Sequence, residues 1–127
     1  MTDAIQVVRD FCAAWEARDQ QRILDAFTDD AVYHNMPMQP AKGKDAIKGL
    51  LSMILTPASD VMFEIKHIVA DGDVVMTERI DSFEIAARTV TLPVMGVFEV
   101  RDGKIAAWRD YFDLTTWTKQ TSESPTT

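Results

Sequence analysis

The fold is decided by residues 61–113, which read VMFEIKHIVADGDVVMTERIDSFEIAARTVTLPVMGVFEVRDGKIAAWRDYFD. Valine, isoleucine, threonine and phenylalanine, which favour β-strands, dominate this stretch. Asp-Gly pairs at residues 71–72 and 102–103 interrupt it, and Asp-Gly between apolar runs is a strong signal for a β-hairpin. The pattern therefore predicts four strands in a meander, at residues 61–70, 73–85, 88–100 and 104–113.

The part of the chain before residue 61 has the pattern of helices. Apolar side chains recur three and four residues apart near the N-terminus, which places them on one face of a helix. Similar spacing follows Asp19, which can cap a second helix that ends at the acidic pair 29–30. The spacing occurs again in a third helix, which Pro57 stops. A short strand, residues 31–36, lies between the second and third helices and is closed by prolines. The apolar positions of the three helices are Val8, Phe11, Cys12 and Trp15; Ile23, Leu24 and Phe27; and Ile47, Leu50, Leu51 and Ile54.

The order of these elements favours the α+β fold class, with helices first and a twisted antiparallel sheet afterwards. Strands longer than about five or six residues tend to curl, so we expect the helices to cover the concave face of the sheet. The chain of 127 residues has the length of one domain. We assign residues 1–120 to this domain and residues 121–127 to a polar C-terminal tail.

The composition excludes several classes of partner. The net charge of −7 repels phosphate backbones and no cluster of lysine and arginine offsets it, so we expect no nucleic acid partner. Apolar residues make up 46% of the chain and charged residues 26%, which is typical of globular proteins and indicates no membrane partner. The single cysteine cannot form an internal disulfide, and the N-terminal segment is acidic where a signal peptide is basic. Both features favour a cytoplasmic location.

Charged residues interrupt the apolar face of the strand predicted at residues 73–85. Side chains two residues apart in a strand share a face, so Arg79 and Asp81 lie on the same face as Val75 and Phe83. This is the more apolar face of the strand, and we expect it to point into the core. Because burial of a charge is costly unless the charge is paired, the arginine is expected to bind carboxylates there.

The last predicted strand and the short strand before the third helix carry a similar pattern. Asp110 shares a face with the aromatic Trp108 and Phe112, so it is also expected to point inward. Tyr33 and Asn35 share a face of the short strand. A phenol and an amide side by side have the donors and acceptors that hold a water molecule.

Together, Arg79, Asp81 and Asp110 suggest a carboxylate–guanidinium–carboxylate array. Two carboxyl groups held by one arginine titrate differently, so we expect one to keep its proton while the other is ionised. Such an array provides one general acid and one general base in a dry cavity. Taken singly, each residue is more often a structural hydrogen-bonding group or a surface ion. The assignment of faces depends on an unbroken register, and Pro93 and Gly96 favour a bulge in their own strand.

Three short motifs, at residues 33–35 (YHN), 79–81 (RID) and 108–113 (WRDYFD), carry a resemblance to a known family. Their combination in this order resembles the limonene-1,2-epoxide hydrolases, over residues 4–118. The resemblance implies the NTF2-like fold, also called SnoaL-like, in which a curved, mixed but mostly antiparallel sheet forms a cone. The cone surrounds a pocket that the N-terminal helices close. That fold serves many functions, so the site residues have to carry the functional argument.

The resemblance also implies a role for each of the five polar residues. Asp110 would take a proton from water, and Tyr33 and Asn35 would hold that water. Asp81 would protonate the epoxide oxygen, while Arg79 would bridge the two carboxylates and orient the epoxide. The implied reaction is one concerted step that gives a vicinal diol, and neither a metal nor an organic cofactor is required.

The implied partners are water and a small apolar epoxide, for which the pocket needs an apolar wall. A second copy of the chain is also expected, because the family resemblance implies a homodimer and a curved open sheet leaves a convex apolar face. The residues expected to line the pocket are Phe83, Leu92, Val94 and Phe112, with Leu51 and Ile54 from the third helix.

Two other functions stay open at this point. An isomerase or cyclase of the SnoaL-like or ketosteroid-isomerase-like kind would move a proton with one carboxylate, but it needs a neutral oxyanion donor that Arg79 replaces poorly. A non-catalytic binding module would keep the charges as a structural ion network.

Four further residues receive no catalytic or metal-binding role. Cys12 is interpreted as a small hydrophobic residue and Asp113 as an outward or capping residue. Neither His34 nor His67 has the companions that a metal site needs.

Overall fold

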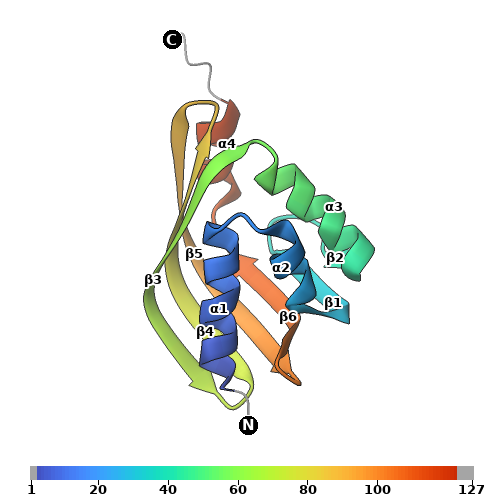
Figure 1. The fold of residues 1–127 in the computed structure, drawn as a ribbon. Helices are drawn as coiled ribbons and strands as arrows, with labels where there is room; N and C mark the ends of the chain where they lie inside the picture. The colour runs from blue at the N-terminus through green and yellow to red at the C-terminus, as the bar shows by residue number, and fades with distance from the viewer. Residues whose placement is uncertain (1–2, 123–127) are drawn as a thin grey trace.

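Six strands form a single sheet in the computed structural model, which describes residues 3–122 (Figure 1). Among these strands the first and the last pair in parallel, and the other neighbours pair antiparallel. The prediction of a mixed, mostly antiparallel sheet in an α+β fold is confirmed. The strands are β1 (Phe27–Asn35), β2 (Ala41–Lys42), β3 (Ala58–Asp71), β4 (Val74–Ile85), β5 (Arg88–Arg101) and β6 (Lys104–Tyr111), in the spatial order β2-β1-β6-β5-β4-β3.

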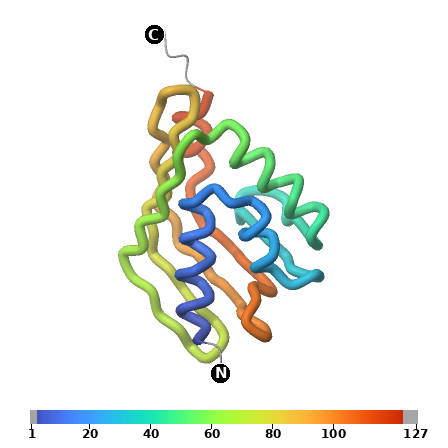
Figure 2. The backbone as a smooth tube through the Cα atoms, viewed as in Figure 1, coloured from blue at the N-terminus to red at the C-terminus, as the bar shows by residue number. Residues whose placement is uncertain are grey.

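The helices lie on one face of this sheet, which we call the inner face (Figure 1). The backbone trace shows the long β3–β4 hairpin curving past the first helix (Figure 2). Asp3 and Asp19 cap the first two helices, because their side chains accept hydrogen bonds from backbone N–H groups of the first turns. No helix within residues 3–122 is long and apolar enough to cross a membrane. The helices are α1 (Ala4–Glu16), α2 (Gln20–Asp25), α3 (Lys44–Leu55) and α4 (Leu114–Ser122).

An aromatic cluster fills the space between α1 and the sheet. Phe11 of α1 contacts the rings of Phe27 and Trp108 edge to face, with ring centroids 5.2 and 4.9 Å apart. Trp108 in turn stacks on Tyr33, with centroids 4.2 Å apart and planes 5° from parallel. These contacts fix the position of β1 and β6, two of the three strands that carry buried polar residues on the inner face.

The register of the sheet brings distant parts of the chain together. The parallel pairing of β1 with β6 places Tyr33 beside Trp108 and Asn35 beside Asp110. The antiparallel pairing of β4 with β5 runs without interruption from Val74 to Ile85. The predicted inward face of β4 is therefore correct over its whole length.

Several details of the sequence prediction are wrong. Phe27 begins β1 instead of extending α2, and both β2 and α4 were not predicted. The bulge that Pro93 and Gly96 would permit does not occur, and both residues keep their register with β4. Thr121 and Ser122, assigned to the tail, belong to α4, whereas residues 123–127 lie outside the described residues.

Candidate active site

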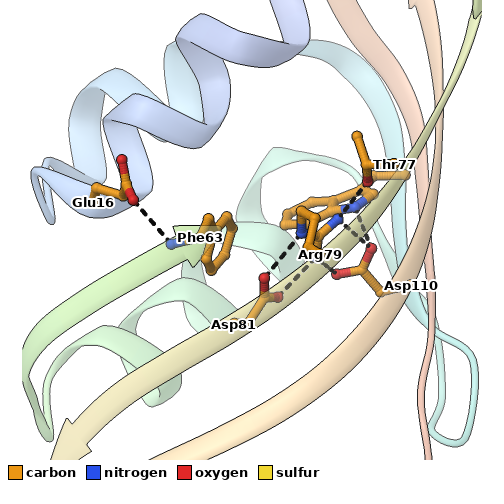
Figure 3. A network of polar contacts seen from close by, with 7 residues as sticks. Glu16, Phe63, Thr77, Arg79, Asp81 and Asp110 are labelled. Carbon is orange, nitrogen blue, oxygen red and sulfur yellow. Dashed lines mark hydrogen bonds and ion pairs between the residues drawn. The ribbon is translucent and has the colours of Figure 1, made fainter. Parts of the chain in front are cut away.

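Arg79 lies fully buried on the inner face, between the carboxyl groups of Asp81 and Asp110 (Figure 3). Its Nε and Nη2 donate to the two oxygens of Asp81 at 3.0 and 2.8 Å. Its Nη2 and Nη1 also donate to the two oxygens of Asp110 at 2.7 and 3.2 Å. The remaining hydrogen bond goes from Nη1 to the hydroxyl of Thr77 at 3.0 Å. The five N–H groups of the guanidinium are thus matched by five hydrogen bonds, and the predicted array is present.

Aromatic residues complete the surroundings of the array. The indole N–H of Trp108 donates to Oδ1 of Asp110 at 2.7 Å. The guanidinium carbon of Arg79 lies 5.0 Å from the ring centroid of Phe63 and 5.8 Å from that of Trp108. Such ring faces stabilise a cation where water is excluded. The sequence placed Trp108 on the correct face without indicating its hydrogen bond to Asp110.

The surroundings of Asp81 favour its protonated form. Burial raises the pKa of Asp81 from 3.8 to about 6; the hydrogen bonds and charge of Arg79 oppose this shift, and the charge of Asp110 adds to it. For Arg79, burial alone would lower the pKa, but the charge of Asp110 and the contacts with Asp81 raise it well above its usual range. The array therefore combines a permanent cation with one carboxyl that can hold a proton near neutral pH.

Tyr33 and Asn35 lie beside Asp110 at the end of β1. Both are buried, and their strand pairs in register with the segment that ends at Asp110. Burial, followed by the negative charge of Asp110, raises the pKa of Tyr33 far above its usual range. The phenol is consequently neutral and has a hydrogen to donate.

A cavity of about 300 Å³ opens above the array, and its wall is mostly apolar. Four of the five predicted polar residues reach it, namely Tyr33, Asn35, Asp81 and Asp110. Arg79 does not line the cavity but lies behind the carboxyl groups, so direct orientation of a ligand by its guanidinium is not supported. Among the predicted wall residues, Ile54, Phe83, Leu92, Val94 and Phe112 line the cavity, whereas Leu51 is fully buried in the core and does not.

Residues 2–123 match the family model described as the limonene-1,2-epoxide hydrolase catalytic domain. The chain belongs to the limonene-1,2-epoxide hydrolase family. It is 40% identical over 109 residues to the epoxide hydrolase EphG of Mycobacterium tuberculosis, which covers 84% of this chain and 71% of EphG. The solved structure of an LEH-like epoxide hydrolase from M. tuberculosis is 37% identical and superposes with a TM-score of 0.81, covering 92% of this chain and 87% of the other. The chain is accordingly an epoxide hydrolase of the limonene-1,2-epoxide hydrolase type.

More distant structures share the fold of this epoxide hydrolase. One is a protein from Shewanella putrefaciens described as a putative SnoaL-like polyketide cyclase, which is 15% identical and superposes with a TM-score of 0.84 over 96% of this chain and 98% of the other. At this level of identity the similarity concerns the fold alone. The expected NTF2-like or SnoaL-like fold is confirmed, and the cyclase alternative gains no support beyond it.

The C-terminal helix α4 of this epoxide hydrolase supplies a part of the cavity wall that the sequence did not reveal. Trp117 of α4 lines the cavity and meets the ring of Phe83 edge to face, with centroids 5.7 Å apart. The side-chain amide of Gln120 accepts from the backbone N–H of Thr91 at 2.9 Å and donates to its carbonyl at 2.7 Å. The pairing of β5 with β6 ends at Met95 and Tyr111, so β6 does not extend alongside Thr91. The side chain of Gln120 makes the hydrogen bonds to Thr91 that a neighbouring strand would otherwise make.

Cys12 and Asp113, to which the sequence analysis gave no catalytic role, do not line the cavity of the hydrolase. Asp113 is exposed and accepts from Thr116 Oγ1 at 2.8 Å at the start of α4, as expected for a capping residue. Cys12 is buried, and this burial raises the pKa of its thiol to about 12, which keeps it protonated. Within residues 3–122 no group of three His, Cys, Asp or Glu residues is arranged to hold a metal ion.

Proposed function

We propose that this epoxide hydrolase adds water to a small apolar epoxide in one step, with Asp110 as general base and Asp81 as general acid. The observation that carries the proposal is that two buried carboxyl groups, bridged by one guanidinium, reach the same apolar cavity. A vicinal diol is the product. No covalent intermediate is part of the proposed reaction.

Asp110 is the proposed base because every hydrogen bond to its carboxyl group comes from a donor. Its two oxygens accept three hydrogen bonds, two from Arg79 and one from Trp108. An ionised carboxylate has about four acceptor positions, so one is left for a proton of the attacking water. Tyr33 and Asn35, which line the same cavity as Asp110, hold the water oxygen so that a lone pair points at the epoxide carbon.

Asp81 is the proposed acid because it is the carboxyl whose pKa is raised. As the water oxygen bonds to one ring carbon, the C–O bond on the opposite side breaks, and its electron pair takes the proton of Asp81. The proton released by water goes to Asp110. The diol leaves with both hydroxyl groups neutral, and transfer of the proton from Asp110 back to Asp81 restores the enzyme.

Diol formation with solvent oxygen is the first test of this function. With limonene oxide, cyclohexene oxide or styrene oxide in a single turnover in oxygen-18 water, we expect the first diol formed to carry one labelled oxygen. Mass spectrometry of the diol measures the label. An unlabelled first product would indicate oxygen from a protein carboxylate and would contradict direct attack by water. Absence of diol from every epoxide would contradict the proposed substrate class.

We also propose that α4 limits the size of the epoxide, because Trp117 forms part of the wall and Gln120 anchors the helix. Gln120→Ala is expected to loosen α4 and to raise kcat/KM for the bulky stilbene oxide relative to styrene oxide by about 10-fold. Steady-state kinetics with both epoxides measure this ratio. Gln21→Ala removes an exposed hydrogen bond within α2 and serves as the control. An unchanged ratio in Gln120→Ala would rule out a role of the anchor in specificity.

We further propose a homodimer formed through the outer face of the sheet. Met95 pairs with Tyr111 in the register of β5 and β6, and Met76 pairs with Val97 between β4 and β5. Met76, Met95 and Tyr111 are each almost half exposed, so the face presents apolar side chains to solvent. Met95→Glu places a charge in the middle of this face and is expected to produce a monomer. Sedimentation velocity compares it with the wild type, and a monomeric wild type would contradict the proposal.

The expected cytoplasmic location also belongs to these proposals. The free and buried thiol of Cys12 supports it, since a reducing compartment keeps a single cysteine unpaired. Cell fractionation with an antibody to the chain tests it.

A further inference from the structure

Gly96 occupies the point at which the array crosses the sheet. Arg79 is on β4 and Asp110 is on β6, and β5 lies between these two strands. In the register of β5, Gly96 pairs with Thr77 on one side and with Asp110 on the other. The guanidinium of Arg79 therefore has to pass over the inner face of β5 at Gly96 to reach Asp110.

The space above Gly96 is already taken by the array. A Cβ atom built on Gly96 would lie 2.5 Å from Nη1 of Arg79, 2.6 Å from Oδ1 of Asp110 and 3.0 Å from Oγ1 of Thr77. Carbon atoms do not approach nitrogen and oxygen atoms this closely without displacement. All three neighbours are the ends of side chains, and Nη1 of Arg79 donates a hydrogen bond to each of the other two.

The backbone conformation at residue 96 does not require a glycine. The strand continues through it without a bulge, and glycine weakens the interior of a strand. The other inward positions of β5 carry large apolar side chains, among them Val94 and Phe98 on either side of Gly96. Close approach of another group is the remaining reason for a bare backbone at this position.

We propose that Gly96 is a positioning residue, whose lack of a side chain allows Arg79 to bridge Asp110 to Asp81 across β5. The inference rests on the proposed acid–base function for its effect on rate, and on the geometry alone for its effect on the array. A methyl group at this position separates Nη1 from Asp110 and Thr77. The base then loses part of its cation, while the cavity wall, to which Gly96 does not belong, is preserved.

Gly96→Ala is the test, with Gly49→Ala as the matched control. Gly49 is exposed in α3, and a Cβ built on it meets nothing within 4 Å. We expect Gly96→Ala to lower kcat at least about 100-fold with a change in KM of less than about threefold, and Gly49→Ala to keep both values. A Gly96→Ala enzyme with wild-type kcat would overturn the inference.

A spectroscopic measurement separates this inference from the proposed function. The ¹⁵N signals of the Arg79 side chain and the pH titration of the Asp81 carboxyl carbon report the array without any substrate. Both are expected to differ between Gly96→Ala and the wild type, even if the wild type forms no diol. Identical spectra and titrations would show that the methyl group leaves the array intact, and the inference would be wrong.

A double variant covers the case in which Gly96→Ala does not fold. Arg79→Gln shortens the side chain and empties the space above Gly96. If that space is the reason for the glycine, the double variant Arg79→Gln/Gly96→Ala folds at pH 5 and melts close to Arg79→Gln, although Gly96→Ala alone does not fold. A double variant that also fails to fold, while Arg79→Gln folds, would assign the glycine to the backbone instead and would contradict the proposal.

Discussion

Asp81→Asn lowers the rate of diol formation by about 10²- to 10⁴-fold, the usual contribution of a general acid, while the chain stays folded. The amide keeps the shape of the carboxyl group and can accept a hydrogen bond from Arg79, but it has no acidic proton for the epoxide oxygen. Rates of diol formation, together with circular dichroism and thermal unfolding, measure both parts of this expectation.

The pH dependence of the same variant has a defined sign. In the folded chain the pKa of Asp81 is about 6, above its unfolded value of 3.8, so the folded state binds more protons between these values. The contribution of Asp81 to stability is therefore present below about pH 4 and is lost as the pH rises through 6. Asp81→Asn lacks this loss, so its melting temperature relative to the wild type rises from pH 5 to pH 8. The rate depends on pH through the same carboxyl group. Because Asp81 has to hold a proton to act as the acid, kcat/KM of the wild type is expected to fall as the pH rises through about 6.

Asp113→Asn is the control, because Asp113 is exposed and caps α4. It should keep its activity within about threefold of the wild type, as surface substitutions commonly do. Wild-type activity in Asp81→Asn would remove Asp81 from the role of acid. A variant that loses stability and leaves the rate unchanged would favour the reading of the charges as a structural network.

Arg79→Gln is expected to have the largest effect on stability. It leaves two buried carboxyl groups without their cation, and breaking a buried ion pair from one side costs about 3–5 kcal/mol. The loss should be largest at pH 8, which is above the pKa of about 6 that Asp81 has in the wild type. It should shrink at pH 5, because Arg79 lowers the pKa of Asp81 and its removal allows protonation at higher pH.

Urea unfolding at the two pH values measures the stability of Arg79→Gln. Arg101→Gln provides the matched comparison, since Arg101 pairs with Asp30 on the surface, where both side chains are more than half exposed. A surface pair contributes about 0–1 kcal/mol, so this control should unfold close to the wild type at both pH values. Equal stability of Arg79→Gln and the wild type at pH 8 would show that the array is not required for folding.

The inward face of β4 was predictable because it depends on local alternation alone. Once the hairpin at Asp71-Gly72 sets the direction of the chain, Arg79 and Asp81 follow from their parity with Val75 and Phe83. The same argument places Asp110. It fails for Gly96, because sequence cannot distinguish a glycine that permits a bulge from one that permits another side chain to pass over it.

Other parts of the site depend on contacts between distant segments. The neighbourhood of Tyr33 and Asp110 requires the parallel pairing of β1 with β6, which no local pattern encodes. Helix α4 is rich in threonine, a weak helix former, so the low helix propensity of this segment did not predict a helix. The main indication of α4 in the sequence is Asp113, which can cap a helix. Leu51 has the helical spacing of a wall residue, but only the packing of α3 decides that it faces the core.

The guanidinium of Arg79 has all of its hydrogen atoms engaged within the protein, so it has no donor left for a ligand. The polar floor of the cavity is thus assembled before a molecule enters, and under the proposed function the selectivity for epoxides comes from the apolar wall above it. Substitutions at Ile54, Leu92 and Trp117, which change the shape of the cavity, are therefore the ones to use in directed evolution toward other epoxides. Lysine cannot substitute for the arginine, because three ammonium hydrogens cannot satisfy five acceptor contacts.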